Sequence, residues 1–200
     1  MKRLLIVLLL IYTTSLYAQS INYSRAQQGN ATIWGIIENE NFLEIEKAPW
    51  ISTKKTGRVI KVSSLRLLPP VDPSKVLAIG LNYRSHSGES GAKKPELFAK
   101  FPSSLQTSGD IYIPSDATNI HYEGELVIVI GKKLKNATIE EARKAIFGIT
   151  IGNDISERNW QSEDLQWIRA KASDGFAPVG PFLVTGVDWS DLIISTYVNG

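Results

Sequence analysis

The stretch His121–Ile130, HYEGELVIVI, places two glutamates directly before a run of branched apolar residues. Such a run is typical of a buried β-strand, in which alternate side chains point to the same face. Glu123 and Glu125 would therefore point to one face, and the alternate apolar residues that begin at Leu126 would point to the other. Two carboxylates are thus predicted side by side at the start of a core strand.

A third carboxylate, Asp154, follows a second apolar run at Phe147–Ile151. Neighbouring carboxylates in apolar surroundings are unfavourable unless a cation or a shared proton neutralises them. The chain has no cysteine, and neither of its two histidines stands at ligand spacing. An all-oxygen set suits a hard divalent ion, Mg²⁺, Mn²⁺ or Ca²⁺, better than zinc. We therefore predict a metal site formed by Glu123, Glu125 and Asp154.

The first 18 residues have the pattern of a secretory signal peptide. Lys2 and Arg3 form a basic start, Leu4–Tyr12 is an apolar run, and Thr13–Ala18 is small and polar. The apolar run is short for a membrane helix, and no later segment is long and apolar enough to span a bilayer. We expect export to the periplasm or medium, with no membrane span after cleavage; an uncleaved anchor is the alternative.

The composition indicates an ordinary globular protein and gives no sign of a polyanionic partner. The chain has 200 residues, of which 43% are hydrophobic and 21% charged. Removing residues 1–18 lowers Lys plus Arg from 22 to 20, against 20 acidic residues. A near-neutral chain does not favour nucleic acid or an anionic membrane surface. The lack of cysteine also excludes disulfides and thiolate metal sites.

The pattern along the chain predicts two domains of mostly β-structure, in the α+β class. Residues 19–70 read as a small β-rich N-terminal domain, with strands expected at 32–37, 42–45 and 59–62. Three prolines, at 69, 70 and 73, interrupt regular structure and place the boundary near residue 70. Residues 71–200 form the second domain.

The second domain is expected to combine short strands with one helix. The expected strands are 76–80, 111–113, 126–130, 147–151, 179–184 and 193–198. Thr138 and Glu141 form a capping-box pattern, and Ala142, Ala145 and Ile146 supply an apolar face for the helix that follows. The polar segment 85–94 has no periodicity and is a candidate lid.

Several motifs, in order, resemble the fumarylacetoacetate hydrolase family. They are GLNYRSH at 80–86 with Glu89, KFPSSL at 100–105, YEGEL at 122–126, NDISER at 153–158 with Gln161, and Lys171 with Gly180 and Pro181. The resemblance covers about residues 76–185, continues more weakly to the end, and extends to the small N-terminal domain of longer members. The chain resembles a C-terminally truncated member, so the fold would be an incomplete fumarylacetoacetate hydrolase-like mixed β-roll.

The resemblance implies a Mg²⁺ or Mn²⁺ ion held by the predicted carboxylate trio, a small-molecule 2-oxo or β-diketo acid as substrate, and a homodimer as a further expectation. His86 and Glu89, three residues apart, would form a water-activating base. Lys171 would supply positive charge to the developing enolate. Arg158 and Gln161 could grip the substrate carboxylate from one helix face. The weaker candidates for lining the pocket are Tyr83, Lys100 and Ser104.

Three functions remain open on this basis. The leading one is metal-dependent hydrolysis of a carbon–carbon bond in a substrate of the fumarylacetoacetate, fumarylpyruvate or acylpyruvate type. The second is an isomerase or decarboxylase of the 2-hydroxyhepta-2,4-diene-1,7-dioate type, as in aromatic catabolism. The third is a degenerate, non-catalytic binding protein. Taken singly, the same residues also suit a solvated strand face, an exposed loop histidine and surface charges.

Overall fold

The computed structural model describes residues 19–83 and 94–200. The signal-peptide pattern at 1–18 lies outside the described residues, and so do His86 and Glu89. The roles predicted for these segments stay predictions.

The N-terminal part is an antiparallel meander of four strands. These are β1 (Ile21–Gln28), β2 (Ala31–Glu38), β3 (Asn41–Ile45) and β4 (Lys55–Lys61). Gly29 and Asn39 have φ values of 56° and 55° in the two short connections before β2 and β3. Positive φ is what tight hairpin turns need, and glycine and asparagine adopt it at low cost. A short strand, β5 (Arg66–Leu68), also pairs with β1.

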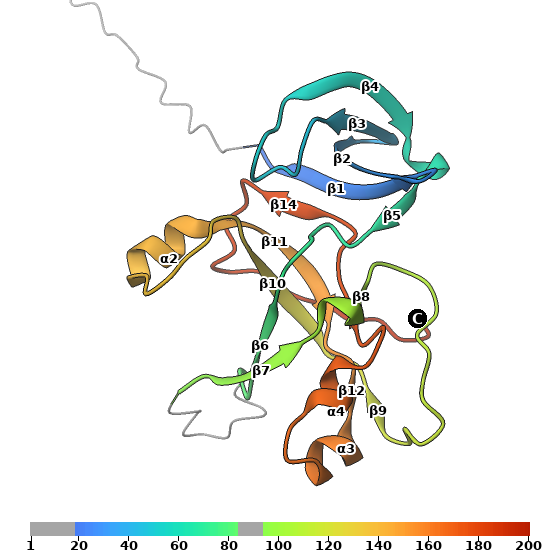
Figure 1. Ribbon diagram of the computed structural model, residues 1–200, viewed down its shortest axis with the longest axis vertical. Helices are drawn as coiled ribbons and strands as arrows, with labels where there is room; N and C mark the ends of the chain where they lie inside the picture. The colour runs from blue at the N-terminus through green and yellow to red at the C-terminus, as the bar shows by residue number, and fades with distance from the viewer. Residues whose placement is uncertain (1–18, 84–93) are drawn as a thin grey trace, which may run out of the picture.

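This meander continues into the strands that carry the acidic residues (Figure 1). β14 (Leu183–Thr185) pairs with β1 on one side and with β11 (Ile146–Asn153) on the other. β11 in turn pairs with β10 (Gly124–Ile130), so the strand order is β10-β11-β14-β1-β2-β3-β4, with β5 beside β1. One sheet therefore runs through both sides of residue 70, and the division into two domains stays a prediction.

The main core cluster joins the two parts of the sheet. Tyr23 and Ile45 pack in one buried cluster with Val129 of β10 and Leu183 of β14. Aromatic rings close it from the side, with Trp50 lying edge-on to both Trp34 and Phe147 at centroid distances of 5.1 and 6.1 Å. Edge-to-face pairs of this kind add packing energy beyond the buried area. The meander is therefore packed onto the strands that lead to the acidic residues.

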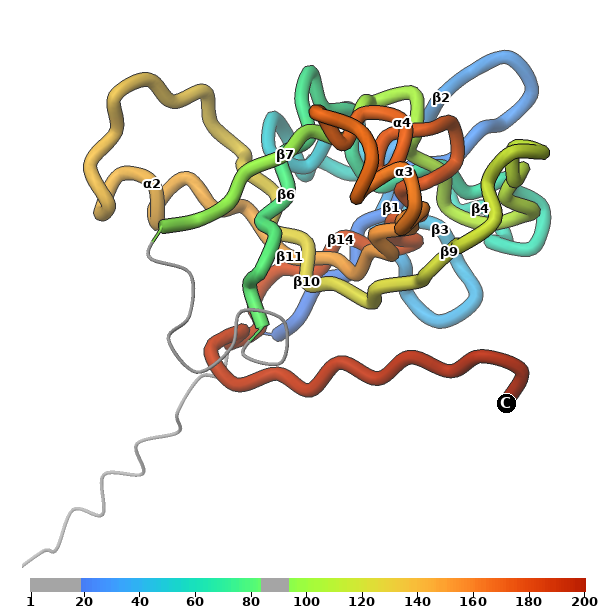
Figure 2. Tube along the Cα trace, turned by 90° about the horizontal axis from the view of Figure 1, so that it is seen from below, coloured from blue at the N-terminus to red at the C-terminus, as the bar shows by residue number. Residues whose placement is uncertain are grey.

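The remaining elements are short, and most of them lie around β10 and β11 (Figures 1 and 2). The two-stranded sheets are β6 (Val76–Gly80) with β7 (Glu96–Lys100), β9 (Ile120–His121) with β12 (Ser156–Glu157), and the parallel pair β8 (Leu105–Gln106) with β13 (Ala177–Pro178). The helices are α2 (Ile139–Ala145), α3 (Arg158–Glu163) and α4 (Ile168–Ala172), and the 3-10 turns are Val62–Ser64 and Pro102–Ser104. The fold is mostly β with few helices, as predicted.

The expected helix cap is present at the start of α2. The Thr138 hydroxyl accepts a hydrogen bond from the Glu141 backbone N–H at 3.3 Å, and the Glu141 carboxylate accepts one from the Thr138 N–H at 2.8 Å. These reciprocal bonds satisfy two backbone donors that the first turn leaves unpaired.

Three expected strands are corrected. Residues 111–113 and 193–198 form no strand, and Tyr112 and Ile193 are 78% and 94% exposed. The C-terminal segment instead runs extended along one side of the molecule (Figure 2). The strand expected at 179–184 begins only at Leu183, because Pro181 has no N–H to give to a ladder. In the described residues, no helix is both long and apolar enough to cross a membrane.

Gly35 in β2 should tolerate no larger residue. A Cβ at this position would lie 2.3 Å from Cε1 of Phe42, which is fully buried. We expect Gly35→Ala to lower the free energy of unfolding by about 1–3 kcal/mol through overpacking, measured by chemical denaturation. Adding Phe42→Leu should recover part of the loss because it makes room, and strictly additive losses would contradict the clash.

Candidate active site

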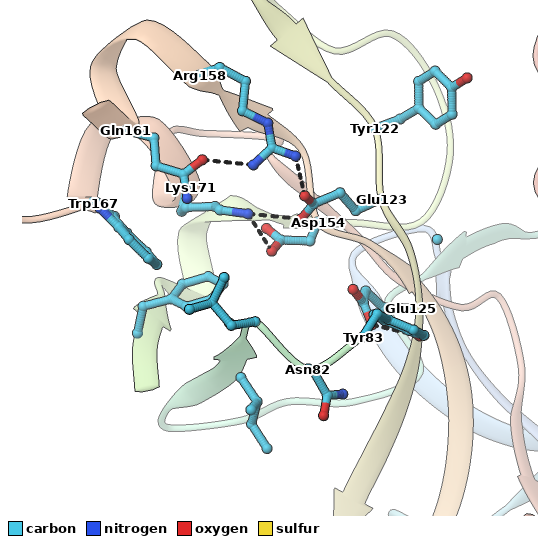
Figure 3. A pocket seen from close by; sticks show the side chains of 15 residues that line it. Asn82, Tyr83, Tyr122, Glu123, Glu125, Asp154, Arg158, Gln161, Trp167 and Lys171 are labelled. Carbon is cyan, nitrogen blue, oxygen red and sulfur yellow. Dashed lines mark hydrogen bonds and ion pairs between the residues drawn. The ribbon is translucent and has the colours of Figure 1, made fainter. Parts of the chain in front are cut away.

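A cavity of about 290 Å³ opens where β6 and β7 face the ends of β10 and β11 (Figure 3). One side of it is charged and polar, and is formed by Glu123, Glu125, Asp154, Arg158, Gln161 and Lys171. The other side is largely apolar, and is formed by Ile79, Leu81, Phe98 and Trp167. A mostly concave site with convergent polar groups on one wall is typical of small-molecule binding.

Backbone pairing places Glu123 beside Asp154. Gly124 pairs with Asn153 at the ends of β10 and β11, and the Asp154 N–H donates to the Glu123 carbonyl at 2.8 Å. The Asn153 side chain accepts from the Glu123 N–H at 2.9 Å. These hydrogen bonds therefore hold the ends of β10 and β11 together at the positions of Glu123 and Asp154.

Lys171, in α4, supplies the cation between these two carboxylates. Its side chain is 3% exposed, and its Nζ lies 2.8 Å from both Glu123 Oε2 and Asp154 Oδ2. The ammonium also lies 5.0 Å from the centre of the Phe98 ring, a cation–π distance. Lys171 thus joins the acidic wall of the cavity to the aromatic wall.

Arg158 and Gln161 lie on α3, three residues apart, as the spacing predicted. The Arg158 guanidinium donates to Glu123 and, at 2.7 Å, to Gln161 Oε1. Burial alone would raise the pKa of Glu123, but the hydrogen bonds from Lys171 and Arg158 lower it to about 2. Glu123 is therefore an anion throughout the physiological range.

Glu125 has a different environment from Glu123. Its Oε2 accepts a hydrogen bond from the Tyr83 hydroxyl at 3.3 Å. Burial and the neighbouring Asp154 raise the pKa of the Glu125 carboxyl above its usual value, and the bond from Tyr83 opposes that rise. Negative charge is thus least compensated at Glu125.

Glu157 organises the helix that carries Arg158. It has no exposed surface, and its carboxylate accepts hydrogen bonds from the N–H groups of Thr118, Asn119 and Trp160 at 3.1, 2.7 and 2.6 Å. Burial alone would raise the pKa of Glu157, but these backbone donors hold it below its ordinary value. One carboxylate therefore caps α3 and ties it to the segment before β9.

The structure brings together seven of the residues predicted for the site. Those that line the cavity are Tyr83, Glu123, Glu125, Asp154, Arg158, Gln161 and Lys171. The predicted lining positions of Lys100 and Ser104 are not found. Lys100 is 5% exposed and lies behind the cavity, and the fully buried Ser104 hydroxyl donates to the Phe101 carbonyl at 2.7 Å.

Other lining residues were not assigned from the sequence. Asn82 and Tyr122 stand inside the quoted motifs, next to assigned residues, and this adjacency was a usable signal. Trp167 was expected from the sequence to pack at the flank of the site, and it lines the cavity. Phe98, whose ring lies 5.6 Å from that of Trp167, resembles an ordinary core aromatic in the sequence, and no local pattern distinguishes it.

The carboxylates fit a hard cation by their chemistry. In the residues that the structure describes, no three acidic or histidine side chains converge as a metal-binding group. The Lys171 ammonium lies between Glu123 and Asp154. Asp154 Oδ1 lies 2.5 Å from the Lys100 ammonium, and Oδ2 faces the cavity beside Lys171. The fit to Mg²⁺ or Mn²⁺ therefore rests on the chemistry of the set, which is three carboxylates without a sulfur or imidazole ligand.

Comparison with models of protein families identifies the family of the chain. The family model for the fumarylacetoacetate (FAA) hydrolase C-terminal domain matches residues 75–200, and a model described as Rv2993c-like, N-terminal, matches residues 23–70. The chain belongs to the fumarylacetoacetate hydrolase family. The resemblance seen in the sequence motifs is thereby confirmed.

Relatives within the fumarylacetoacetate hydrolase family carry out different reactions. The chain is 41% identical over 164 residues to protein Rv2993c of Mycobacterium tuberculosis, covering 78% of this chain and 62% of that protein. It is 40% identical over 152 residues to the mitochondrial oxaloacetate tautomerase fahd2 of Xenopus laevis, covering 71% and 48%. A solved 5-carboxymethyl-2-hydroxymuconate delta-isomerase from Mycobacterium smegmatis superposes with a TM-score of 0.78 at 36% identity, covering 85% and 69%.

The chain thus spans about half to three fifths of the length of these two curated relatives. Members of the fumarylacetoacetate hydrolase family are enzymes that bind small-molecule substrates, and these neighbours support the predicted mostly-β fold.

The cap formed by Glu157 should make the stability of the folded chain fall as the pH is lowered. Because its pKa is lower in the folded than in the unfolded chain, its stabilisation is fully present above the ordinary glutamate value and is lost as pH falls below it. Glu157→Gln should cost about 1–3 kcal/mol at neutral pH, and the difference from wild type should shrink in acid. Chemical denaturation at a series of pH values measures both effects.

Glu163→Gln is the matched control, because Glu163 is exposed on the same helix. This variant should change stability little at any pH. Equal losses for the two variants would contradict the assignment of Glu157 as the cap.

Proposed function

We propose that the chain is a divalent-metal-dependent enzyme that acts on a 2-oxo or β-diketo acid through an enolate. The observation that carries the proposal is the Lys171 ammonium, held in the cavity at 2.8 Å from both Glu123 and Asp154. A positive group fixed where little water enters is well placed to stabilise an oxyanion that forms beside it.

Glu123, Glu125 and Asp154 would hold Mg²⁺ or Mn²⁺, which on binding would supply a Lewis acid for the carboxylate and keto oxygens of a 2-oxo acid. The residues of the chain have separate tasks. Lys171 balances charge on the enolate, and Arg158 and Gln161 orient the substrate carboxylate from α3. The apolar wall of Phe98 and Trp167 favours a planar, uncharged tail, as in an acylpyruvate.

Hydrolysis of a carbon–carbon bond is the leading reaction, with His86 and Glu89 as the water-activating base. The second candidate is tautomerisation or isomerisation, which needs the same enolate but no attacking water. It is favoured by the similarity of the chain to an oxaloacetate tautomerase, at 40% identity, and to a delta-isomerase, at 36% identity. A non-catalytic binding protein is the candidate of another class.

One assay separates these candidates. The chain is incubated with Mg²⁺ or Mn²⁺ and with acetylpyruvate or oxaloacetate, while acetate and pyruvate release is followed by NMR and enol–ketone exchange by absorbance. Acetate release that His86→Ala abolishes supports hydrolysis, whereas exchange that survives His86→Ala supports the isomerase class. Tight metal binding without turnover of either compound supports the non-catalytic reading.

Lys171→Met should lower kcat/KM by about 10²–10³-fold, as expected when one preorganised group facing an oxyanion is removed. Methionine removes the charge while keeping apolar packing against Phe98, and circular dichroism establishes that the variant is folded before its turnover is measured. Lys54→Met, which removes an exposed ion pair with Glu46 far from the cavity, is the control and should leave turnover unchanged. Wild-type turnover in a folded Lys171→Met variant would overturn the role of Lys171.

A further inference from the structure

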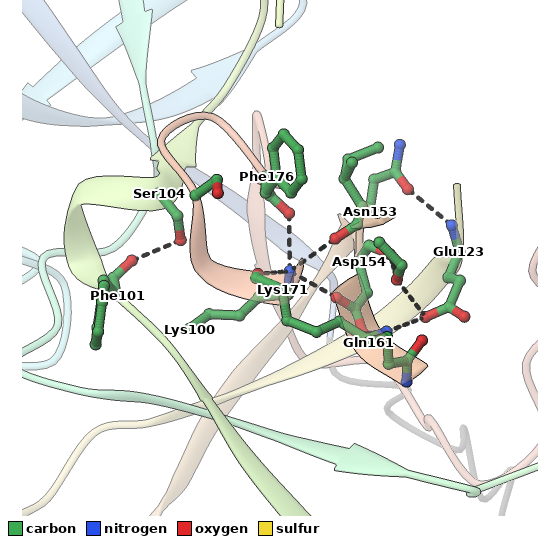
Figure 4. Close-up of polar contacts among 12 residues, drawn as sticks. Lys100, Phe101, Ser104, Glu123, Asn153, Asp154, Gln161, Lys171 and Phe176 are labelled. Atoms are coloured by element: carbon green, nitrogen blue, oxygen red, sulfur yellow. Dashed lines mark hydrogen bonds and ion pairs between the residues drawn. The ribbon is translucent and has the colours of Figure 1, made fainter. Parts of the chain in front are cut away.

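Lys100 is the last residue of β7 and is 5% exposed, behind the wall of the cavity (Figure 4). Its Nζ donates hydrogen bonds to the carbonyls of Ile155, at 3.4 Å, and Phe176, at 2.8 Å, and to that of Lys171. The same Nζ lies 2.5 Å from Asp154 Oδ1. The side chain does not reach the cavity surface, so it cannot touch a substrate there.

Four oxygens surround the Lys100 Nζ, those of three backbone carbonyls and Oδ1 of Asp154. An ammonium has three N–H donors and no acceptor, so an environment made only of acceptors suits the charged form. The Asp154 carboxylate supplies the opposite charge at 2.5 Å.

Two of the three carbonyls, those of Ile155 and Lys171, belong to segments that carry the reacting groups. Ile155 directly follows Asp154, and the carbonyl of Lys171 lies in the last turn of α4. A helix of five residues leaves its final carbonyls without partners, so a cation at that end is stabilising. The Phe176 carbonyl also accepts from the Ile155 N–H at 3.2 Å, which closes the cluster.

β7 therefore contacts α4 through two alternate residues with different tasks. Phe98 faces the Lys171 ammonium and the Trp167 ring, while Lys100, two residues further on, binds the Lys171 backbone. One strand thus fixes both ends of Lys171, the main chain from behind and the ammonium from the cavity side.

We propose that Lys100 is a positioning residue, a built-in cation that holds Lys171 and Asp154 in their working orientation without contacting substrate. The kinetic consequence rests on the proposed function, whereas the positioning itself does not. Removing the ammonium should let α4 and the Asp154 segment shift, and misplacement of reacting groups by about 1 Å can cost about 100-fold in rate.

The test compares the full wild-type chain with Lys100→Ala by NMR of lysine ammonium groups. Buried ammonium protons exchange slowly with water, so the Lys171 signal, assigned by its loss in Lys171→Arg, reports that group directly. We expect the signal to broaden or disappear in Lys100→Ala and to return on addition of propylammonium, which replaces the missing part of the side chain. Tetramethylammonium, with the charge but no N–H donor, should not restore it.

Phe42→Leu is the matched control, because it loosens the remote core cluster around Ala26 and Ile33. It should lower the melting temperature while leaving the Lys171 signal intact, which separates positioning from general loss of stability. Lys100→Gln, with two neutral N–H donors, undergoes the same test if the alanine variant does not fold. An unchanged Lys171 signal in either folded variant would overturn the proposal.

Turnover of oxaloacetate with Mg²⁺ gives the second readout. kcat should fall about 100-fold in Lys100→Ala with little change in KM, and propylammonium should restore it. A wild-type chain without turnover of oxaloacetate or acetylpyruvate would refute the proposed function, and the ammonium signal would still decide the role of Lys100.

Discussion

The pairing of buried charges at the ends of β10 and β11 is the constraint on which the site depends. Glu123 and Asp154 are brought together by strand pairing, and like charges in such a place are unfavourable without cations. Lys171 lies between them, and Arg158 and Lys100 approach from either side. Removing one partner of a buried pair typically costs about 3–5 kcal/mol, so α3, α4 and β7 are all held to this point by their cations.

The sheet provides the rigid base that such a charge cluster needs. Val129 of β10 and Leu183 of β14 pack in the same cluster as Tyr23 of the N-terminal meander. The strand ends that carry the acidic residues therefore cannot shift without disturbing a core that extends across most of the sheet. The meander, which contributes no residue to the cavity, still contributes to the geometry of the site.

Much of this arrangement could be predicted because it is local. The capping box of α2, the apolar runs of β10 and β11, and the three-residue spacing of Arg158 and Gln161 each depend on near neighbours in the sequence. The strands expected at 111–113 and 193–198 were wrong because a short apolar run forms a strand only when a partner strand is available. β1, whose sequence is largely polar, was missed for the converse reason, since pairing with β2, β5 and β14 stabilises it.

The two buried lysines show where reasoning from sequence ends. Both were assigned to the pocket, and both are almost fully buried beside Asp154. Both ammonium groups contact the Asp154 carboxylate, but their other partners differ. Lys171 Nζ also binds the Glu123 carboxylate at the cavity wall, whereas Lys100 Nζ donates to backbone carbonyls behind it. Backbone acceptors have no signature in the sequence, because every residue carries one. A positioning lysine can therefore be distinguished from a catalytic lysine only when the path of the main chain around its ammonium group is known.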